Sequence, residues 1–246
     1  ESAEELKDQL KSECHYIIEP ELTYTYFAET ARNNAFNREQ LQKAFNNIEQ
    51  SDPLFADLFT DIDLYSNRLG TGDQKQSDTV SSLIKEIDKA DLLNTDADIL
   101  GNAYEYLIGQ FASETGKKAG EFYTPQPVSK ILTRIAIAGQ EDKRGLLVYD
   151  PCMGSGSLLL NAKKYAKEPQ YIRYFGQELM TSTYNLARMN MFLHGIAPEN
   201  QKLRNGDTLD EDWPTGEETD FDMVLMNPPY SAKWSAAAGF LQDERF

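Results

Sequence analysis

The sequence LLVYDPCMGSGS, residues 146–157, decides the fold of the second half of the chain. It begins with an apolar run that predicts a buried strand over 146–149. The glycines that follow let the backbone come close to a bound molecule. A helix predicted from there through Ala166 would offer free N–H groups to a carboxylate or a phosphate. The stretch therefore predicts a strand, a loop and a helix that together bind a nucleotide-like ligand.

Three more strands are predicted after this loop, with an amphipathic helix over 181–194. They end at Glu178, before Asp207, and at Asn227, which closes the apolar run 221–226. Alternating strands and helices are typical of a parallel sheet, and the run 221–226 suits a buried strand of such a sheet. Ligands bind outside the carboxyl ends of these strands. The polar residues at the strand ends are therefore expected around one crevice, together with Asp150.

The corner after the fourth strand reads Asn-Pro-Pro-Tyr, residues 227–230. Two successive prolines fix φ and carry no N–H group, so this turn presents an amide, a carbonyl acceptor and an aromatic ring with little freedom to relax. The glycine loop itself is less specific, because Leu159 stands where the third glycine of the dinucleotide fingerprint would be.

The first half of the chain predicts helices over 38–50, 81–90 and 96–114, with an exposed polar loop over 69–77. We assign these helices to packing and partner contact. The third helix is expected to bury one face, made of Ile99, Leu100, Ala103, Tyr106, Leu107, Gln110 and Phe111.

A second motif, Phe-Tyr-Thr-Pro over residues 122–125, leads into a helix predicted over 126–138. Thr124 followed by Pro125 is typical of an N-cap and a first helical turn. Read alone, the motif is a capped helix with an aromatic lead-in.

The formal charge of −16 is unevenly distributed. Residues 1–116 hold nine basic against 23 acidic residues, a net charge of −14, whereas residues 117–246 hold 15 against 17, a net charge of −2. A surface that meets phosphate must therefore come from the second half, from a further segment or from a partner.

The remaining composition points to a cytoplasmic protein without a membrane span or a signal peptide. Its two cysteines are far apart in sequence and indicate no disulfide framework, and the two isolated histidines complete no metal signature. Cys152 and His194 lack an evident catalytic partner, so we interpret both as structural.

Together these motifs resemble the AdoMet-dependent amino-methyltransferases. The Phe-Tyr-Thr-Pro motif upstream of the glycine loop is similar to that of the gamma-order N6-adenine DNA methyltransferases. The helical first half leading into this motif resembles the modification subunit of type I restriction-modification systems, over nearly the whole chain. The resemblance implies an α/β fold with a Rossmann-like AdoMet-dependent methyltransferase sheet, truncated after the fourth strand. An all-α N-terminal domain over 1–116 would precede a catalytic domain over 117–246.

The resemblance also implies roles for individual residues, with S-adenosyl-L-methionine (AdoMet) as cofactor. An adenine flipped out of DNA would meet the catalytic residues Asn227, Pro228, Pro229 and Tyr230. Glu178 would hold the ribose of the cofactor and Asp207 its adenine. The implied cofactor-binding set is Glu121, Phe122, Tyr123, Thr124, Pro125, Asp150, Gly154, Ser155, Gly156, Glu178 and Asp207. Met153 and Ser157 depart from the residues common in relatives, without removing a polar contact.

The implied partners are DNA, a specificity subunit that reads the DNA sequence, and a nuclease subunit, in a complex with two copies of this chain. Two alternatives stay open. The same Asn-Pro-Pro-Tyr turn serves enzymes that methylate a glutamine side-chain amide or an RNA base amine. The chain could also be a non-catalytic scaffold with a methyltransferase fold, although the intact Asn227 and Tyr230 argue against this.

Overall fold

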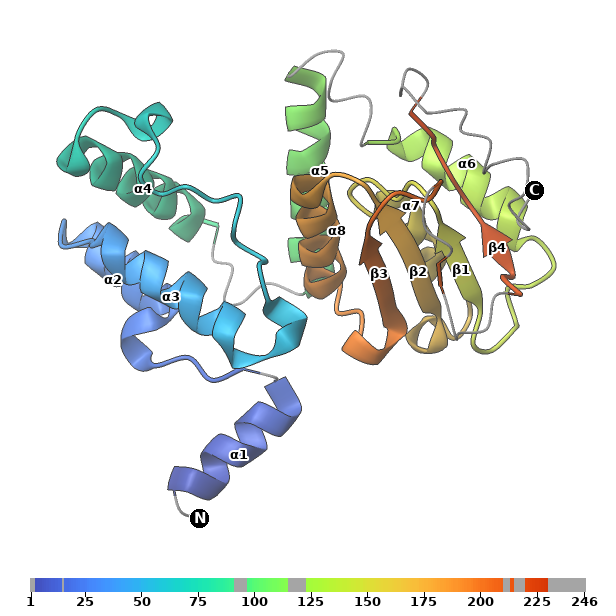
Figure 1. The fold of residues 1–246 in the computed structure, drawn as a ribbon, viewed down its shortest axis with the longest axis horizontal. Coiled ribbons are helices and arrows are strands. Elements are labelled where there is room, and N and C mark those ends of the chain that lie inside the picture. The colour runs from blue at the N-terminus through green and yellow to red at the C-terminus, as the bar shows by residue number, and fades with distance from the viewer. Residues whose placement is uncertain are drawn as a thin grey trace.

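The structure, a computed structural model, describes residues 3–14, 16–90, 97–114, 123–209, 213–214 and 220–229. Within these residues the second half forms a parallel sheet in the order β3-β2-β1-β4. Its strands are β1 (Leu147–Asp150), β2 (Arg173–Glu178), β3 (Gln201–Asn205) and β4 (Met223–Val224). Figure 1 shows the strands side by side, apart from the N-terminal helices α1 to α4. The predicted parallel α/β sheet is confirmed.

Strand β4 is shorter and more exposed than the sequence predicts. Met223 and Leu225 are buried, but Val224 is 55% exposed and Met226 is 46% exposed. The strand pairs with β1 on one side, and in the described part of the chain it forms an edge of the sheet. The prediction of a buried strand therefore holds for one side of this segment, because only alternate side chains face the core.

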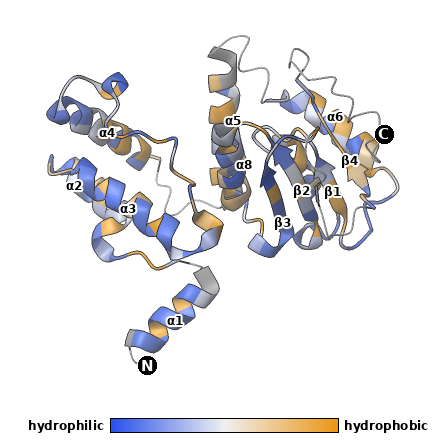
Figure 2. Cartoon of the chain, in the orientation of Figure 1, coloured by the Kyte–Doolittle hydropathy of each residue, from blue (hydrophilic) through white to orange (hydrophobic). Residues whose placement is uncertain are grey.

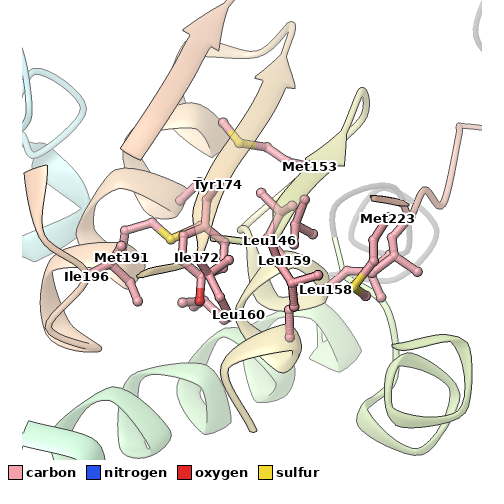
Figure 3. Packing of buried hydrophobic residues seen from close by; sticks show 14 of the residues in the cluster. Leu146, Met153, Leu158, Leu159, Leu160, Ile172, Tyr174, Met191, Ile196 and Met223 are labelled. Atoms are coloured by element: carbon pink, nitrogen blue, oxygen red, sulfur yellow. The ribbon is translucent and has the colours of Figure 1, made fainter. Parts of the chain in front are cut away.

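Helices on one face of the sheet enclose the main hydrophobic core. They are α6 (Gln126–Ile137) before β1, α7 (Ser157–Leu160) after β1 and α8 (Thr181–Leu193) after β2. Helix α7 is shorter than predicted, because the chain continues as a 3-10 turn over Asn161–Lys164. Figure 3 shows Leu158, Leu159, Leu160 and Met191 packed in this core. Each such buried side chain stabilises the fold by about 1.5–3 kcal/mol.

The N-terminal half is helical and has a small core of its own, which includes Phe27, Ala31 and Ile84. Its helices are α1 (Ala3–Cys14), α2 (Tyr24–Arg32), α3 (Arg38–Ser51) and α4 (Asp73–Asp88). Figure 2 shows these helices coloured largely as hydrophilic. The described 3-10 turns outside the main core are Pro20–Leu22, Pro53–Phe55, Asn67–Leu69, Pro169–Tyr171 and Pro198–Asn200. No helix among the described residues is both long enough and apolar enough to cross a membrane.

Helix α4 begins inside the segment that the sequence predicts as an exposed loop, residues 69–77. The side chain of Gln76 is buried, and its amide donates to three carbonyl oxygens of the preceding loop at 3.0–3.3 Å. The buried guanidinium of Arg38 donates to Gln76 and, at 2.9 Å, to Asp73. These contacts join residues distant in sequence, so the local polar composition could not reveal them.

Helix α5 (Ala97–Glu114) forms where it is predicted but buries a different face. Of the predicted core face, only Leu100 is partly buried, and Tyr106 is 66% exposed. The buried residues are instead Gly101, Glu105 and Ile108. Helix α5 lies directly beside α8 in Figure 1, and a β-carbon on Gly101 would lie 2.8 Å from the ring of His194. The absence of a side chain at Gly101, rather than an apolar stripe, allows this close approach.

The N-terminal half docks on α8 through a buried arginine. The guanidinium of Arg188 donates to the carbonyl oxygens of Ala56 at 3.0 Å and Leu54 at 2.6 Å. The ring of Phe55, which lies between these two residues, contacts Phe192 of α8 with a centroid distance of 5.2 Å. The loop after α3 is thus fixed to the helix that follows β2.

Replacing Arg188 by alanine is expected to lower the free energy of unfolding by about 2 kcal/mol, because two carbonyl groups lose a charged donor at a buried position. Urea-induced unfolding of the two proteins measures the difference. Lys89→Ala is the control. The side chain of Lys89 is 68% exposed and pairs with Glu86, so this substitution should lower the free energy of unfolding by roughly 0.5 kcal/mol or less. Equal effects of the two substitutions would contradict the assigned role of Arg188.

Candidate cofactor site

A crevice opens at the carboxyl edge of the sheet. Four segments of the chain line it. Thr124 precedes α6, Asp150 ends β1, and Asn227 follows β4. The rest of the lining comes from the glycine loop and the start of α7, namely Cys152, Met153, Gly154, Ser155, Ser157 and Leu158. The structure thus brings together residues that the sequence analysis selected from three separate motifs.

The glycine loop between β1 and α7 rests on strand β2. Gly154 and Gly156 have φ angles of +55° and +77°, which glycine adopts without steric cost. The N–H of Met153 donates to the carbonyl of Gln177 at 2.9 Å. The sulfur of Met153 occupies the place that a β-carbon on Gly176 would take. Glycines in the loop and in the strand below it are therefore both needed for this conformation.

Three acidic residues gather around the thiol of Cys152. Burial, followed by the negative charges of Asp150, Glu178 and Asp207, raises the pKa of Cys152 to about 11. The thiol is therefore protonated at neutral pH and is a poor nucleophile. All three predicted cofactor acids therefore lie near Cys152, which lines the crevice, although Asp150 and Glu178 end β1 and β2 and Asp207 follows β3.

Two of these acids hold the loop by hydrogen bonds, and one of them, Asp150, also lines the crevice. One oxygen of Asp150 accepts the N–H of Cys152 at 2.9 Å, and the two oxygens of Glu178 accept the N–H groups of Gly154 at 3.1 Å and Met180 at 2.8 Å. Burial raises the pKa of Glu178, and the N–H donors partly offset this. Burial raises the pKa of Asp150 to about 7; the donor at Cys152 acts against this increase and the charge of Glu178 adds to it.

Thr124 lines the crevice and does not cap α6. The N-cap is Pro125, whose carbonyl accepts the N–H groups of Val128 and Ser129 at 2.9 and 3.0 Å. The prediction of Thr124 as the capping residue was therefore wrong by one position. The role of Thr124 in cofactor binding stays a prediction.

The other predicted residues divide into three groups. Asn227 lines the crevice, and Pro228 and Pro229 follow it directly. Glu121, Phe122 and Tyr230 lie outside the described residues. Tyr123 borders a second cavity, beside α5, and does not line the crevice.

His194 lies at the C-terminal end of α8, whereas the first residues of α8 follow the carboxyl edge of the sheet. Its ring nitrogen Nδ1 lies 2.9 Å from the carbonyl oxygen of Asn190, and its ring packs against Gly101 of α5. His194 is not among the residues that line the crevice. Its contacts fit the structural interpretation made from the sequence.

Sequence reasoning missed Ser157 and Leu158, which line the crevice at the start of α7. Their position just after Gly156 was the available signal. It also missed Glu105, a buried carboxylate in the second cavity. The signal there was the spacing of Gly101, Glu105 and Gly109, four residues apart on one side of a helix.

The sheet order and the glycine loop at its carboxyl edge define an α/β domain of the class that binds nucleotide-like cofactors. Comparison with known proteins narrows this class. Residues 95–246 match the N-6 DNA Methylase family, and residues 1–87 match the HsdM N-terminal domain. The chain belongs to the N-6 DNA Methylase family.

Similar proteins include a solved structure, the type I restriction-modification system methyltransferase subunit from Streptococcus thermophilus. It is 59% identical, with a TM-score of 0.93, and the match covers 99% of this chain and 51% of that one. The type I restriction enzyme MpnII methylase subunit of Mycoplasma pneumoniae is 34% identical over all of this chain and 49% of its own length. The MjaVIII methylase subunit of Methanocaldococcus jannaschii is 36% identical over 62% of this chain and 26% of its own length. The chain spans about half the length of the first two relatives.

The raised pKa of Asp150 predicts a pH-dependent stability. The carboxyl group of Asp150 has an ordinary pKa of 3.8 and a pKa of about 7 in the native state. Between these two pH values it is protonated in the native state and ionised in the unfolded state. The stabilisation is present below the unfolded pKa and is lost as the pH rises through the native pKa. Between pH 5 and pH 8, the free energy of unfolding of the wild type should fall by about 2 kcal/mol relative to Asp150→Asn, which mimics the protonated acid. Urea unfolding of both proteins at the two pH values tests this. A difference between the proteins that does not change with pH would refute it.

Proposed function

We propose that this chain carries the cofactor site and the target-amine site of a type I modification subunit, which transfers a methyl group from AdoMet to N6 of adenine in DNA. The observation that carries the proposal is the crevice itself. Asn227 of the Asn-Pro-Pro-Tyr corner lines it together with Asp150, Gly154 and Thr124. A methyl donor held by the glycine loop would therefore lie beside the residues that receive the acceptor amine.

The charges around the crevice fit a cofactor that bears a sulfonium and an ammonium group. The carboxylate of Glu178 disfavours ionisation of Asp150, so a cation bound near both would stabilise their charged forms. Each carboxylate oxygen that accepts a backbone N–H still has a second acceptor position. Asp150 and Glu178 can therefore hold the loop and accept hydrogen bonds from a ligand at the same time.

Bound AdoMet supplies an activated methyl group on a positively charged sulfur. The residues of this chain must make the acceptor amine reactive, because the lone pair of an exocyclic adenine amine is delocalised into the ring. The side-chain oxygen of Asn227 and the carbonyl of Pro228 would each accept one hydrogen bond from that amine. The prolines hold both acceptors in advance, and such preorganisation lowers barriers strongly. Tyr230 would stack on the flipped base and offset part of an unstacking cost of about a few kcal/mol.

Partner subunits would explain how a chain with a formal charge of −16 can act on DNA. An acidic chain is poorly suited to bind DNA phosphates by itself, whereas a specificity subunit can supply both the phosphate contacts and the base readout. We therefore propose a complex with a specificity subunit and a nuclease subunit that contains two copies of this chain, with the helical first half as the docking surface, in the cytoplasm.

Other acceptors are open to the same chemistry, because a glutamine amide and an RNA base amine are also planar nitrogens. A methyl-transfer assay with radiolabelled AdoMet separates the possibilities. We expect label in DNA, in the presence of the specificity subunit, and none in RNA or in a release-factor protein. Label in RNA or in protein would favour that alternative acceptor, and no transfer to any substrate would favour a scaffold.

Asn227→Ala is expected to lower kcat for methyl transfer by roughly 100-fold to 1000-fold, because an acceptor aligned with the reacting amine is lost. The affinity for AdoMet, measured by titration calorimetry, should stay within about threefold of the wild type. Asn200→Ala is a matched control on a 3-10 turn remote from the crevice lining. A loss of AdoMet affinity as large as the loss of rate would sink the assignment of Asn227.

The full-length protein alone is expected to bind duplex DNA weakly and with little sequence preference. Adding the specificity subunit should give tight, sequence-specific binding whose affinity falls steeply with salt concentration. Fluorescence anisotropy with matched target and non-target duplexes measures both. Tight and specific binding by the subunit without its partner would contradict the proposed division of labour.

A further inference from the structure

On helix α5, Gly101, Glu105 and Gly109 lie on one side and contact the rest of the fold. At Gly101 the helix meets the ring of His194, as described above. At Gly109 a β-carbon would lie 3.0 Å from the hydroxyl oxygen of Tyr123 and 3.2 Å from its Cζ atom. The ring of Tyr123 therefore lies directly on the surface of α5, in a place that any side chain at Gly109 would take.

Glu105 lies between these two glycines and is only 5% exposed. Its Oε2 atom is 3.4 Å from the amide nitrogen of Gln126, which donates to it, and 3.8 Å from Nζ of Lys164. Its Oε1 atom has no hydrogen-bond partner among the described residues. A buried carboxylate with incomplete pairing costs stability. Its presence at the centre of this contact calls for a role beyond filling space.

The two residues that α5 holds flank Thr124 on either side. Tyr123 precedes it and lies against Gly109, and Gln126, which contacts Glu105, starts helix α6 two positions after it. Burial, followed by the negative charge of Glu105, raises the pKa of Tyr123, which agrees with their closeness. Thr124 itself lines the crevice. Contacts with α5 at Tyr123 and Gln126 thus fix the segment that carries Thr124.

Asn161 extends this contact toward the glycine loop. Its side-chain amide is 3.5 Å from the side-chain oxygen of Gln126 and donates a short hydrogen bond to Ser129. Asn161 follows α7, which begins immediately after Gly156. The side chain of Gln126 therefore lies between α5 and the element that continues the glycine loop.

We propose that Glu105 is a positioning residue for the cofactor crevice. Glu105 binds Gln126, and Gly109 leaves room for the ring of Tyr123. Together these contacts fix the segment that places Thr124 in the wall of the crevice that the glycine loop also lines. The role rests on the proposed function, because it assigns to α5 a part in AdoMet binding. Glu105 touches neither the cofactor nor the target base, and it acts only through the geometry of the segment 123–126.

The test measures AdoMet affinity of the full-length protein by titration calorimetry, alongside steady-state kinetics with the specificity subunit and DNA. We expect Glu105→Ala and Gly109→Ala each to weaken AdoMet binding about tenfold, which corresponds to one displaced anchoring contact. At saturating AdoMet, kcat and the KM for DNA should stay within about twofold of the wild type. Glu105→Gln keeps an acceptor for Gln126 and should recover most of the lost affinity.

Two controls separate positioning from general destabilisation. Gly101→Ala strains the same face of α5 against His194, so it should lower the Tm without changing AdoMet affinity at temperatures where the protein is folded. Asn102→Ala removes an exposed residue that borders the same cavity as Glu105 and should change neither quantity. Gly109→Ala carries the test alone if Glu105→Ala fails to fold.

Unchanged AdoMet affinity in the folded variants of Glu105 and Gly109 would overturn the inference while leaving the proposed function intact. An equal loss of affinity in Gly101→Ala would also overturn it, because the effect would then come from the helix as a whole. A wild-type protein that binds no AdoMet would instead refute the proposed function, and this inference with it.

Discussion

The geometry of the crevice depends on how the glycine loop packs on strand β2. Register places Asp150 of β1 beside Gly176 of β2, so the chain that leaves β1 crosses β2 where no side chain stands in the way. Met153 fills that gap, and its N–H binds the strand beyond it at Gln177. The loop can then bring its own N–H groups to the carboxylates at the strand ends. A ligand that donates to those carboxylates adds to the hydrogen bonds that they already accept from the loop.

This arrangement concentrates negative charge at one end of the crevice. The carboxyl group of Asp150 is buried and that of Glu178 is half-buried, and the two are close enough to influence one another. The resulting field attracts a cationic ligand and repels phosphate. The first half of the chain is also strongly acidic, with a net charge of −14 over residues 1–116. Under the proposed function, the charges that suit a sulfonium cofactor would leave most phosphate contacts to other surfaces.

The sequence allowed prediction of the parts of the fold that local patterns determine. Alternating apolar runs predicted the parallel sheet, and positions after the strands predicted that Asp150, Glu178, Asp207 and Asn227 would share one edge. Contacts between distant segments could not be predicted. The exposed stripe of α5 looked like a core face because the true contact is made by glycines, which no hydrophobic pattern reports. Gln76 was placed in an exposed loop because its carbonyl partners follow from tertiary packing. The domain boundary at residue 116 stays a prediction, and the packing of α5 on α8 offers the segment before Ala97 as a second position for it.

Helix α8 contacts three separate parts of the protein: the glycine loop, the loop after α3, and α5. Ala187 and Met191 lie under Gly156, where a β-carbon would be 3.5 and 3.4 Å from their side chains, so the helix supports the glycine loop from below. Arg188 and Phe192, on another side, hold the loop after α3. His194 at its end receives α5. Because interiors are close-packed, a shift of α8 toward any one of these contacts must disturb the others. The N-terminal half is thereby tied to the crevice through packing, although none of its described residues lines the crevice.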